Sequence, residues 1–178
     1  EQRRFVQYGR SPQTQDRQRA LEDLRFLINR HGRHGVVLWD PYLSANDLLQ
    51  TLFFCPYSDA YLRALGDGEP VPGSKLQKSG WPQVQYQTLE QYNGCTTGLK
   101  LEFRVRKGNH QRFHDSFLIF PPTDDRGALA WSLGASVNSV GESHHILQEV
   151  SHPQMVLDAF EELWGELSRP DQLVWKTP

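Results

Sequence analysis

Hydrophobic residues recur at helical spacing in two parts of the chain. In residues 16–30, DRQRALEDLRFLINR, charged side chains separate the apolar positions Ala20, Leu21, Leu24, Leu27 and Ile28. Near the other end, HPQMVLDAFEELWGEL carries a second apolar stripe, formed by Met155, Val156, Ala159, Phe160, Leu163, Trp164 and Leu167. Spacings of three and four residues are typical of amphipathic helices, so both stripes predict helices that pack on a core.

Shorter apolar segments between these helices have the patterns of strands. GVVLW, before Asp40, is a continuous apolar run, which is typical of a strand covered on both faces. GLKLEFRVRKG alternates apolar and charged residues and predicts a half-exposed strand. Further strands are expected in DAYLRALGDG, RFHDSFLIF (112–120), ALAWSLGASVNSVG and HHILQEV.

Two more helices and a long loop complete the predicted elements. SANDLLQTLFF begins with Ser44 and Asp47 in a capping-box-like arrangement, and VQYQTLEQYN predicts another helix. Residues 66–82 are rich in glycine and proline and predict a long loop. Because strands and helices alternate, the sequence predicts an α/β fold with a mixed β-sheet flanked by helices on both faces.

The composition is that of an ordinary globular protein. The 178 residues are 38% hydrophobic and 22% charged, with a net charge of −2, and are enough to bury a core without metal or disulfide. No apolar run is long enough to span a membrane. Cys55 and Cys95 form neither a disulfide framework nor a zinc pattern, so a cytoplasmic location is expected. The chain begins at Glu1 without an initiator Met or apolar leader, and we expect it to be part of a longer protein whose other domains are its partners.

Basic residues are concentrated in the first fifth of the chain: Arg3, Arg4, Arg10, Arg17, Arg19, Arg25, Arg30 and Arg33. They could form a phosphate-facing surface, but the solvated face of a helix is the simpler interpretation. We therefore expect residues 1–34 to be a basic amphipathic helical segment packed on a domain of residues 35–178, the two forming one structural unit.

Three polar segments follow one another in the second half of the chain. They are His114, then GASVN with Ser136 and Asn138, then Glu149 after HHILQ. Their order and residue types resemble the signature of the phospholipase D-like superfamily. That signature is His-x-Lys with a following Asp, then Gly-Ser or Gly-x-x-Asn, then Glu. VVLWDPYLSANDLL also resembles the first strand and helix of defence-associated bacterial members. The resemblance covers roughly residues 36–167 and is specific within 112–150.

The resemblance implies a phospholipase D-like fold and phosphodiester chemistry that needs neither metal nor cofactor. One histidine attacks phosphorus and a second protonates the leaving oxygen, because an imidazole titrates near working pH. In this chain His114 would be nucleophile or acid, Asn138 would hold phosphate oxygens with Ser136, and Glu149 would orient a histidine. The superfamily site pairs two histidine motifs. Since this chain has one, activity would need a homodimer or a second domain outside the chain.

Two departures make the motif degenerate. Ser116 occupies the lysine position and Pro121 the aspartate position. A serine can donate a hydrogen bond to phosphate but cannot offset its charge. On a strand, Arg112, His114 and Ser116 would share one face, with Arg112 about 7 Å from His114, where it could supply the cation. A plain surface arginine is the simpler alternative.

Each candidate also has a structural explanation. His114 could bond a neighbouring carbonyl, Asn138 could serve loop geometry, and Glu149 could face solvent. Asp40, at the carboxyl end of its strand, could face a ligand crevice or only initiate a turn before Pro41. Asp115 and Ser116 cannot form a triad with His114, because adjacent strand residues point to opposite faces. No acid or cysteine at ligand spacing completes a site with the three histidines His144, His145 and His152, so no metal site is expected.

The sequence thus favours a phosphodiester-recognition module, most simply for nucleic acid, within a larger bacterial protein. Its degenerate site indicates binding rather than catalysis, and an anti-phage defence role rests on the family resemblance. One alternative is an active metal-independent phosphodiesterase or nuclease that works as a dimer through His114. The other is a non-catalytic module for protein or membrane interaction.

Overall fold

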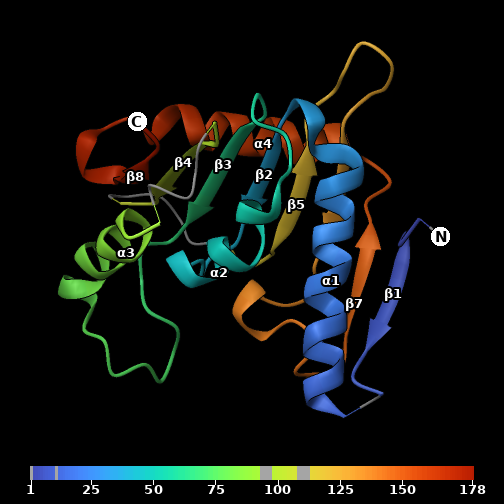
Figure 1. Ribbon diagram of the computed structural model, residues 1–178, viewed down its shortest axis with the longest axis horizontal. Coiled ribbons are helices and arrows are strands. Elements are labelled where there is room, and N and C mark those ends of the chain that lie inside the picture. Colours follow the sequence, from blue (N-terminus) through green and yellow to red (C-terminus); the bar gives the residue numbers. More distant parts are fainter. Residues whose placement is uncertain (1, 11, 93–97, 108–112) are drawn as a thin grey trace.

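A mixed β-sheet runs through the whole molecule. The computed structural model describes residues 2–10, 12–92, 98–107 and 113–178 (Figure 1). Within these residues the sheet has eight strands in the order β1-β7-β6-β5-β2-β3-β4-β8. Their bounds are β1 (Phe5–Tyr8), β2 (Val36–Trp39), β3 (Tyr61–Gly66), β4 (Lys100–Val105), β5 (Phe117–Phe120), β6 (Leu129–Ser132), β7 (His145–Glu149) and β8 (Leu173–Lys176). Strands β2, β3 and β4 are parallel, and the other neighbouring pairs are antiparallel.

Helices cover both faces of this sheet. On one face α1 (Gln13–His31), α2 (Ala45–Gln50) and α3 (Trp81–Glu90) pack over a core that includes Leu27, Leu48 and Leu89. On the other, α4 (Pro153–Glu166) packs over a second core through Leu157 and Phe160. Figure 1 shows α1 and α2 in front of the sheet and α4 behind it. The predicted α/β architecture with helices on both faces is therefore confirmed. No helix in the described ranges is long and apolar enough to cross a membrane.

Two burial predictions were wrong because α4 packs differently from the expected stripe. Strand β4 is not half-exposed: Glu102 is buried, and Arg104 lies under α4 with its guanidinium 4.0 Å from the centre of the Trp164 ring. Arg104 Nη1 also donates to the Trp164 carbonyl at 2.8 Å. Met155, placed in the apolar stripe, is 71% exposed, whereas Leu157 is buried. The charged side of β4 is thus an interface with α4.

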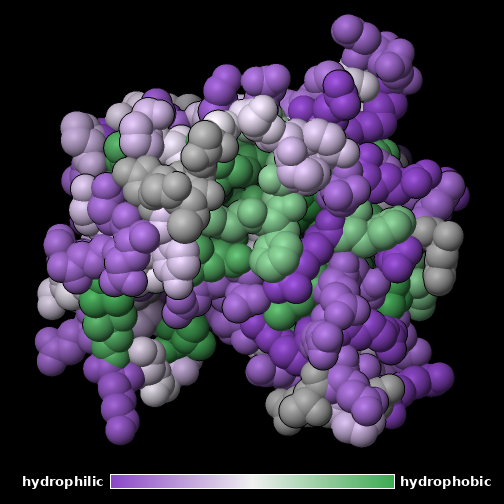
Figure 2. Space-filling model, in the orientation of Figure 1, coloured by the Kyte–Doolittle hydropathy of each residue, from purple (hydrophilic) through white to green (hydrophobic). Residues whose placement is uncertain are grey.

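The N-terminal segment contributes a strand as well as the expected helix. β1 pairs antiparallel with β7, from Phe5 opposite Gln148 to Tyr8 opposite His145. Several of its arginines make contacts within the fold, such as Arg3 with Asp23. Figure 2 shows a largely hydrophilic outer surface along α1. This agrees with the solvated-face interpretation of the basic residues.

The segment 112–120 is only partly a strand. β5 begins at Phe117, so His114, Asp115 and Ser116 precede it, and the prediction that His114 lies in a strand was wrong. The register gives the reason: Phe117 pairs with Trp39, the last residue of β2. Residues before Phe117 therefore have no partner in β2, although the Ser116 carbonyl still accepts the Leu133 N–H on the β6 side.

Candidate functional site

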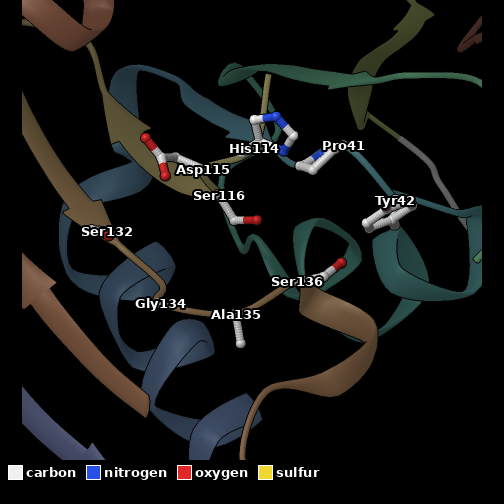
Figure 3. Close-up of a pocket in the computed structure, with 9 residues that line it drawn as sticks. All are labelled: Pro41, Tyr42, His114, Asp115, Ser116, Ser132, Gly134, Ala135 and Ser136. Carbon is white, nitrogen blue, oxygen red and sulfur yellow. The ribbon is translucent and has the colours of Figure 1, made fainter. Parts of the chain in front are cut away.

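A pocket lies at one end of the sheet, beside the ends of three neighbouring strands. β2 ends here and continues into Pro41 and Tyr42, the chain enters β5 through residues 114–116, and β6 ends before Gly134. The cavity has a volume of about 190 Å³ (Figure 3). Its lining is Pro41, Tyr42, His114, Asp115, Ser116, Ser132, Gly134, Ala135 and Ser136. The structure therefore brings His114, Ser116 and Ser136 together in one lining.

Asp40 lies beneath this pocket and organises it. Its carboxyl group is fully buried, and each oxygen accepts a backbone N–H, from Tyr42 at 3.1 Å and from Val137 at 2.6 Å. The Ser136 hydroxyl lies 2.8 and 2.9 Å from the two oxygens. Burial raises the pKa of Asp40, and the hydrogen bonds from Val137, Ser136 and Tyr42 oppose that rise. Asp40 is thus both a turn residue and the link between the end of β2 and the segment that carries Ser136 and Val137.

Ser136 and Asn138 are engaged with each other. The Asn138 amide nitrogen donates to the Ser136 hydroxyl oxygen at 2.9 Å and to the Tyr42 carbonyl at 3.4 Å. Asn138 lies in the short 3₁₀ turn Val137–Ser139, behind Ser136. Its amide nitrogen therefore supports the pocket wall.

Ser116 and His114 differ in exposure. Ser116 is 6% exposed, and its carbonyl accepts the Leu133 N–H at 2.9 Å. His114 and Asp115 are exposed, and in Figure 3 the Asp115 carboxylate points away from His114. These three residues do not form a catalytic triad. Arg112, predicted to supply a cation here, lies outside the described residues.

Comparisons with known proteins give the fold. No known protein family matches the sequence, and no curated protein does. TrmBL2, an archaeal chromatin protein described with a novel mode of DNA binding, is 12% identical, with a TM-score of 0.50 over 92% of this chain and 53% of its own. NucT from Helicobacter pylori is 12% identical, with a TM-score of 0.50 over 95% of this chain and 96% of its own. Nuc from Salmonella typhimurium, a phospholipase D family member, is 13% identical over 97% and 96%, with a TM-score of 0.46.

The chain has a phospholipase D-like fold. It spans about half the length of TrmBL2 and nearly all of NucT. At these identities the likeness concerns the fold, so the chemistry of the pocket has to be argued from its own residues.

Glu149 does not line the pocket that contains His114. It is the last residue of β7 and pairs with Trp131, whereas the pocket adjoins the end of β6. Its carboxylate lies 3.3 Å from Arg4 Nε, and it lines a separate cavity of about 130 Å³ with Arg4, Arg30 and His31. The structure thus separates Glu149 from the other predicted catalytic residues.

His145 is a residue of this region that the sequence patterns did not single out for this role. Its ring is buried, Nδ1 lies 2.9 Å from the Leu133 carbonyl, and the Gly141 N–H donates to Nε2 at 2.8 Å. A ring nitrogen that accepts carries no proton, so the ring is neutral with its proton on Nδ1. His145 therefore ties together both ends of the loop that carries Ser136 and Asn138.

The described residues contain no group of three or more His, Cys, Asp or Glu side chains placed to hold a metal ion.

Proposed function

We propose that this phospholipase D-like domain binds a phosphodiester of a nucleic acid without cleaving it. One observation carries the proposal: Ser116, at the lysine position of the superfamily motif, is buried in the pocket lining and places an uncharged hydroxyl where the motif has a cation. Cleavage requires positive charge where the oxygens of phosphorus gain negative charge. The described residues that line the pocket include no lysine or arginine. The exposed His114 can donate a hydrogen bond to a phosphate, which supports binding at this site.

Nucleic acid is the ligand class that the fold supports best. TrmBL2 shares the fold and is described as a DNA-binding chromatin protein. A phosphate at the mouth of the pocket would accept a hydrogen bond from the His114 imidazole, with Arg112 as a further proposed contact. The place of the domain within a larger bacterial protein, and its role in anti-phage defence, belong to the same proposal and follow from the resemblance of VVLWDPYLSANDLL.

The exposure of His114 favours one second candidate, an active homodimer. Two copies of His114 facing each other would supply the nucleophile and the acid that this chemistry needs. This candidate predicts cleavage in the presence of a chelator, whereas the leading proposal predicts binding alone.

The test measures binding and cleavage together. Fluorescence anisotropy with a labelled single-stranded oligonucleotide in EDTA should show binding by the wild type, and denaturing gels should show an intact strand. His114→Ala should weaken binding about ten- to a hundredfold, because a hydrogen bond to a charged group contributes about 1.5–3 kcal/mol. His152→Ala is the matched control, since His152 is exposed and follows the far end of β7.

Each outcome separates the candidates. Cleavage by the wild type that His114→Ala abolishes would establish the active homodimer. Equal binding by wild type and His114→Ala would show that the pocket does not hold the phosphodiester. Ser116→Lys restores a cation at the motif position and should strengthen binding, because it adds charge beside the phosphate.

A further inference from the structure

Tyr42 contributes an aromatic ring to the lining of the pocket, and its backbone is held on both sides. Its N–H donates to Asp40 Oδ1 at 3.1 Å, and its carbonyl accepts the Asn138 amide at 3.4 Å. The next residue, Leu43, is buried in the core, and its N–H donates to the Asp40 carbonyl at 3.2 Å. These contacts fix the direction in which the Tyr42 side chain leaves the chain, so its ring is a positioned part of the pocket wall.

The Tyr42 side chain has no aromatic or polar partner within the described ranges. It is half-buried, no aromatic ring or cation packs on it there, and its hydroxyl makes no hydrogen bond to any residue that the structure describes. Trp39, three residues earlier, differs: its ring packs against Phe113 and Phe160, with ring centres 5.0 and 5.9 Å apart. A half-buried tyrosine is ordinary by itself. A positioned ring that lines a cavity and packs on no other aromatic ring can offer its face to a ligand.

The wall across from this ring is made of small residues. Gly134 and Ala135 line the pocket with at most one side-chain carbon each, and Figure 3 shows Gly134 on the side of the cavity away from Tyr42. Gly134 has a φ of +69°, and a Cβ atom there would lie 2.4 Å from the Ile146 carbonyl oxygen, so this wall stays open. The cavity of about 190 Å³ is smaller than the roughly 300–1,000 Å³ of sites for drug-sized ligands. A single planar ring is the size of group that fits.

We propose that Tyr42 stacks on an unpaired nucleobase while the adjoining phosphate lies beside His114. Both residues line the same pocket, and Figure 3 shows Pro41 between them. Every base has a π face, so stacking on a tyrosine requires no particular sequence. A base inside a duplex is already stacked and paired, and the ligand is therefore a single strand. This inference rests on the proposed function and specifies its ligand.

The decisive comparison uses the wild-type protein with two labelled strands of equal length. One is oligo-dT, and the other is an abasic strand with the same sugars and phosphates but no bases. Because both strands offer the same phosphates to His114, a difference in affinity measures the contacts made by the bases. Fluorescence anisotropy in EDTA should show oligo-dT binding about tenfold more tightly, a difference of about 1.4 kcal/mol and near the low end for a base stacked on an aromatic side chain.

Variants of Tyr42 assign this preference to its ring. Tyr42→Leu keeps an apolar side chain without a π face, and it should lower the affinity for oligo-dT to that for the abasic strand. Tyr42→Phe keeps the ring and should keep the preference. Tyr86→Leu is the matched control, since Tyr86 is exposed on α3 and does not line the pocket. If Tyr42→Leu does not fold by circular dichroism, the wild type and Tyr42→Phe decide the inference.

Contrary results separate the inference from the function on which it rests. Equal binding of oligo-dT and the abasic strand by the wild type overturns the stacking assignment and leaves the proposed function standing. Binding of neither strand overturns the proposed function itself. A preference that survives in Tyr42→Leu, or is lost in Tyr42→Phe, overturns the role of the ring. Equal affinity for oligo-dT and for its fully paired duplex with oligo-dA overturns the assignment to a single strand.

Discussion

Gly141 shows how little space the loop behind the pocket has. It lies where the loop meets the start of α1, with a φ of +78°, and a Cβ atom placed on it would lie 2.3 Å from the Asp16 carbonyl oxygen. That oxygen belongs to backbone and cannot turn aside. Gly141→Ala should therefore lower the free energy of unfolding by about 2 kcal/mol, the range for a strained backbone position, as measured by urea denaturation.

Gly165 is the matched control for this substitution. It lies within α4, and a Cβ atom there would have open space. Alanine stabilises a helix interior relative to glycine, so Gly165→Ala should raise the free energy of unfolding by up to about 1 kcal/mol. Equal effects at the two positions would contradict the close contact between Gly141 and Asp16.

At the scale of elements, the neutral ring of His145 joins β7 to the loop that carries Ser136 and Asn138. Burial lowers the pKa of His145, and His144 lowers it further, while Asp16 and the bond to the Leu133 carbonyl oppose the shift. The Tyr8 ring of β1 also packs against it, with ring centres 4.9 Å apart. The unfolded chain then binds a proton more readily than the folded one. The contribution to stability is complete above the unfolded pKa of about 6.5 and is lost as the pH falls below it.

The lowered pKa of His145 predicts how the stability of the fold changes with pH. Urea denaturation followed by tryptophan fluorescence should show wild-type stability falling between about pH 7 and pH 5, and falling less in His145→Ala. Burial also lowers the pKa of His31, to about 4, which likewise makes stability fall as the pH falls. Burial raises the pKa of Asp47 to about 6, and this has the opposite effect on stability. Both remain in the variant, so the difference isolates His145. His152→Ala, at an exposed histidine, should keep the wild-type slope, and an unchanged slope in His145→Ala would contradict the assignment.

Elements with a local signal were predicted from the sequence, and the two edge strands of the sheet, β1 and β8, were not. α1 was predicted because its apolar residues recur at helical spacing, and α2 because Ser44 and Asp47 form the capping box. β1 and β8 have only four residues each, and their strand character depends on β7 and β4, far away in the chain. Local patterns carry no information on such partners.

The pocket was predictable only in part for the same reason. The motif order places His114, Ser116 and Ser136 near the ends of neighbouring strands, and the structure brings them together. The role of Asp40 depends on hydrogen bonds to Ser136 and Val137, almost a hundred residues away. The position of Glu149 depends on the register of β7 against β6. Neither the bonds nor the register can be derived from spacing along the chain.

At the scale of the whole molecule, one continuous sheet connects the two cavities and the N-terminal residues. Ser132 of β6 lines the pocket, and its neighbour Trp131 lines the separate cavity with Arg4, Arg30 and Glu149. Residues 1–34 supply both an edge strand and the longest helix, so they complete the sheet and one of its two cores. A boundary placed after residue 34 would therefore cut through the sheet and through one of its cores.

The last prediction concerns a chain reduced to residues 35–178. Removing residues 1–34 deletes β1 and α1, including Leu24, Leu27 and Ile28, which are at most 2% exposed. The apolar face beneath them would meet water, at about 25 cal/mol per Å² of apolar surface, a loss comparable with the marginal stability of a domain. Residues 35–178 alone should therefore lack a cooperative thermal transition by circular dichroism and give poorly dispersed amide resonances, while the full chain shows both. A cooperative, well-dispersed fragment would show instead that residues 1–34 are an accessory segment on an independent domain.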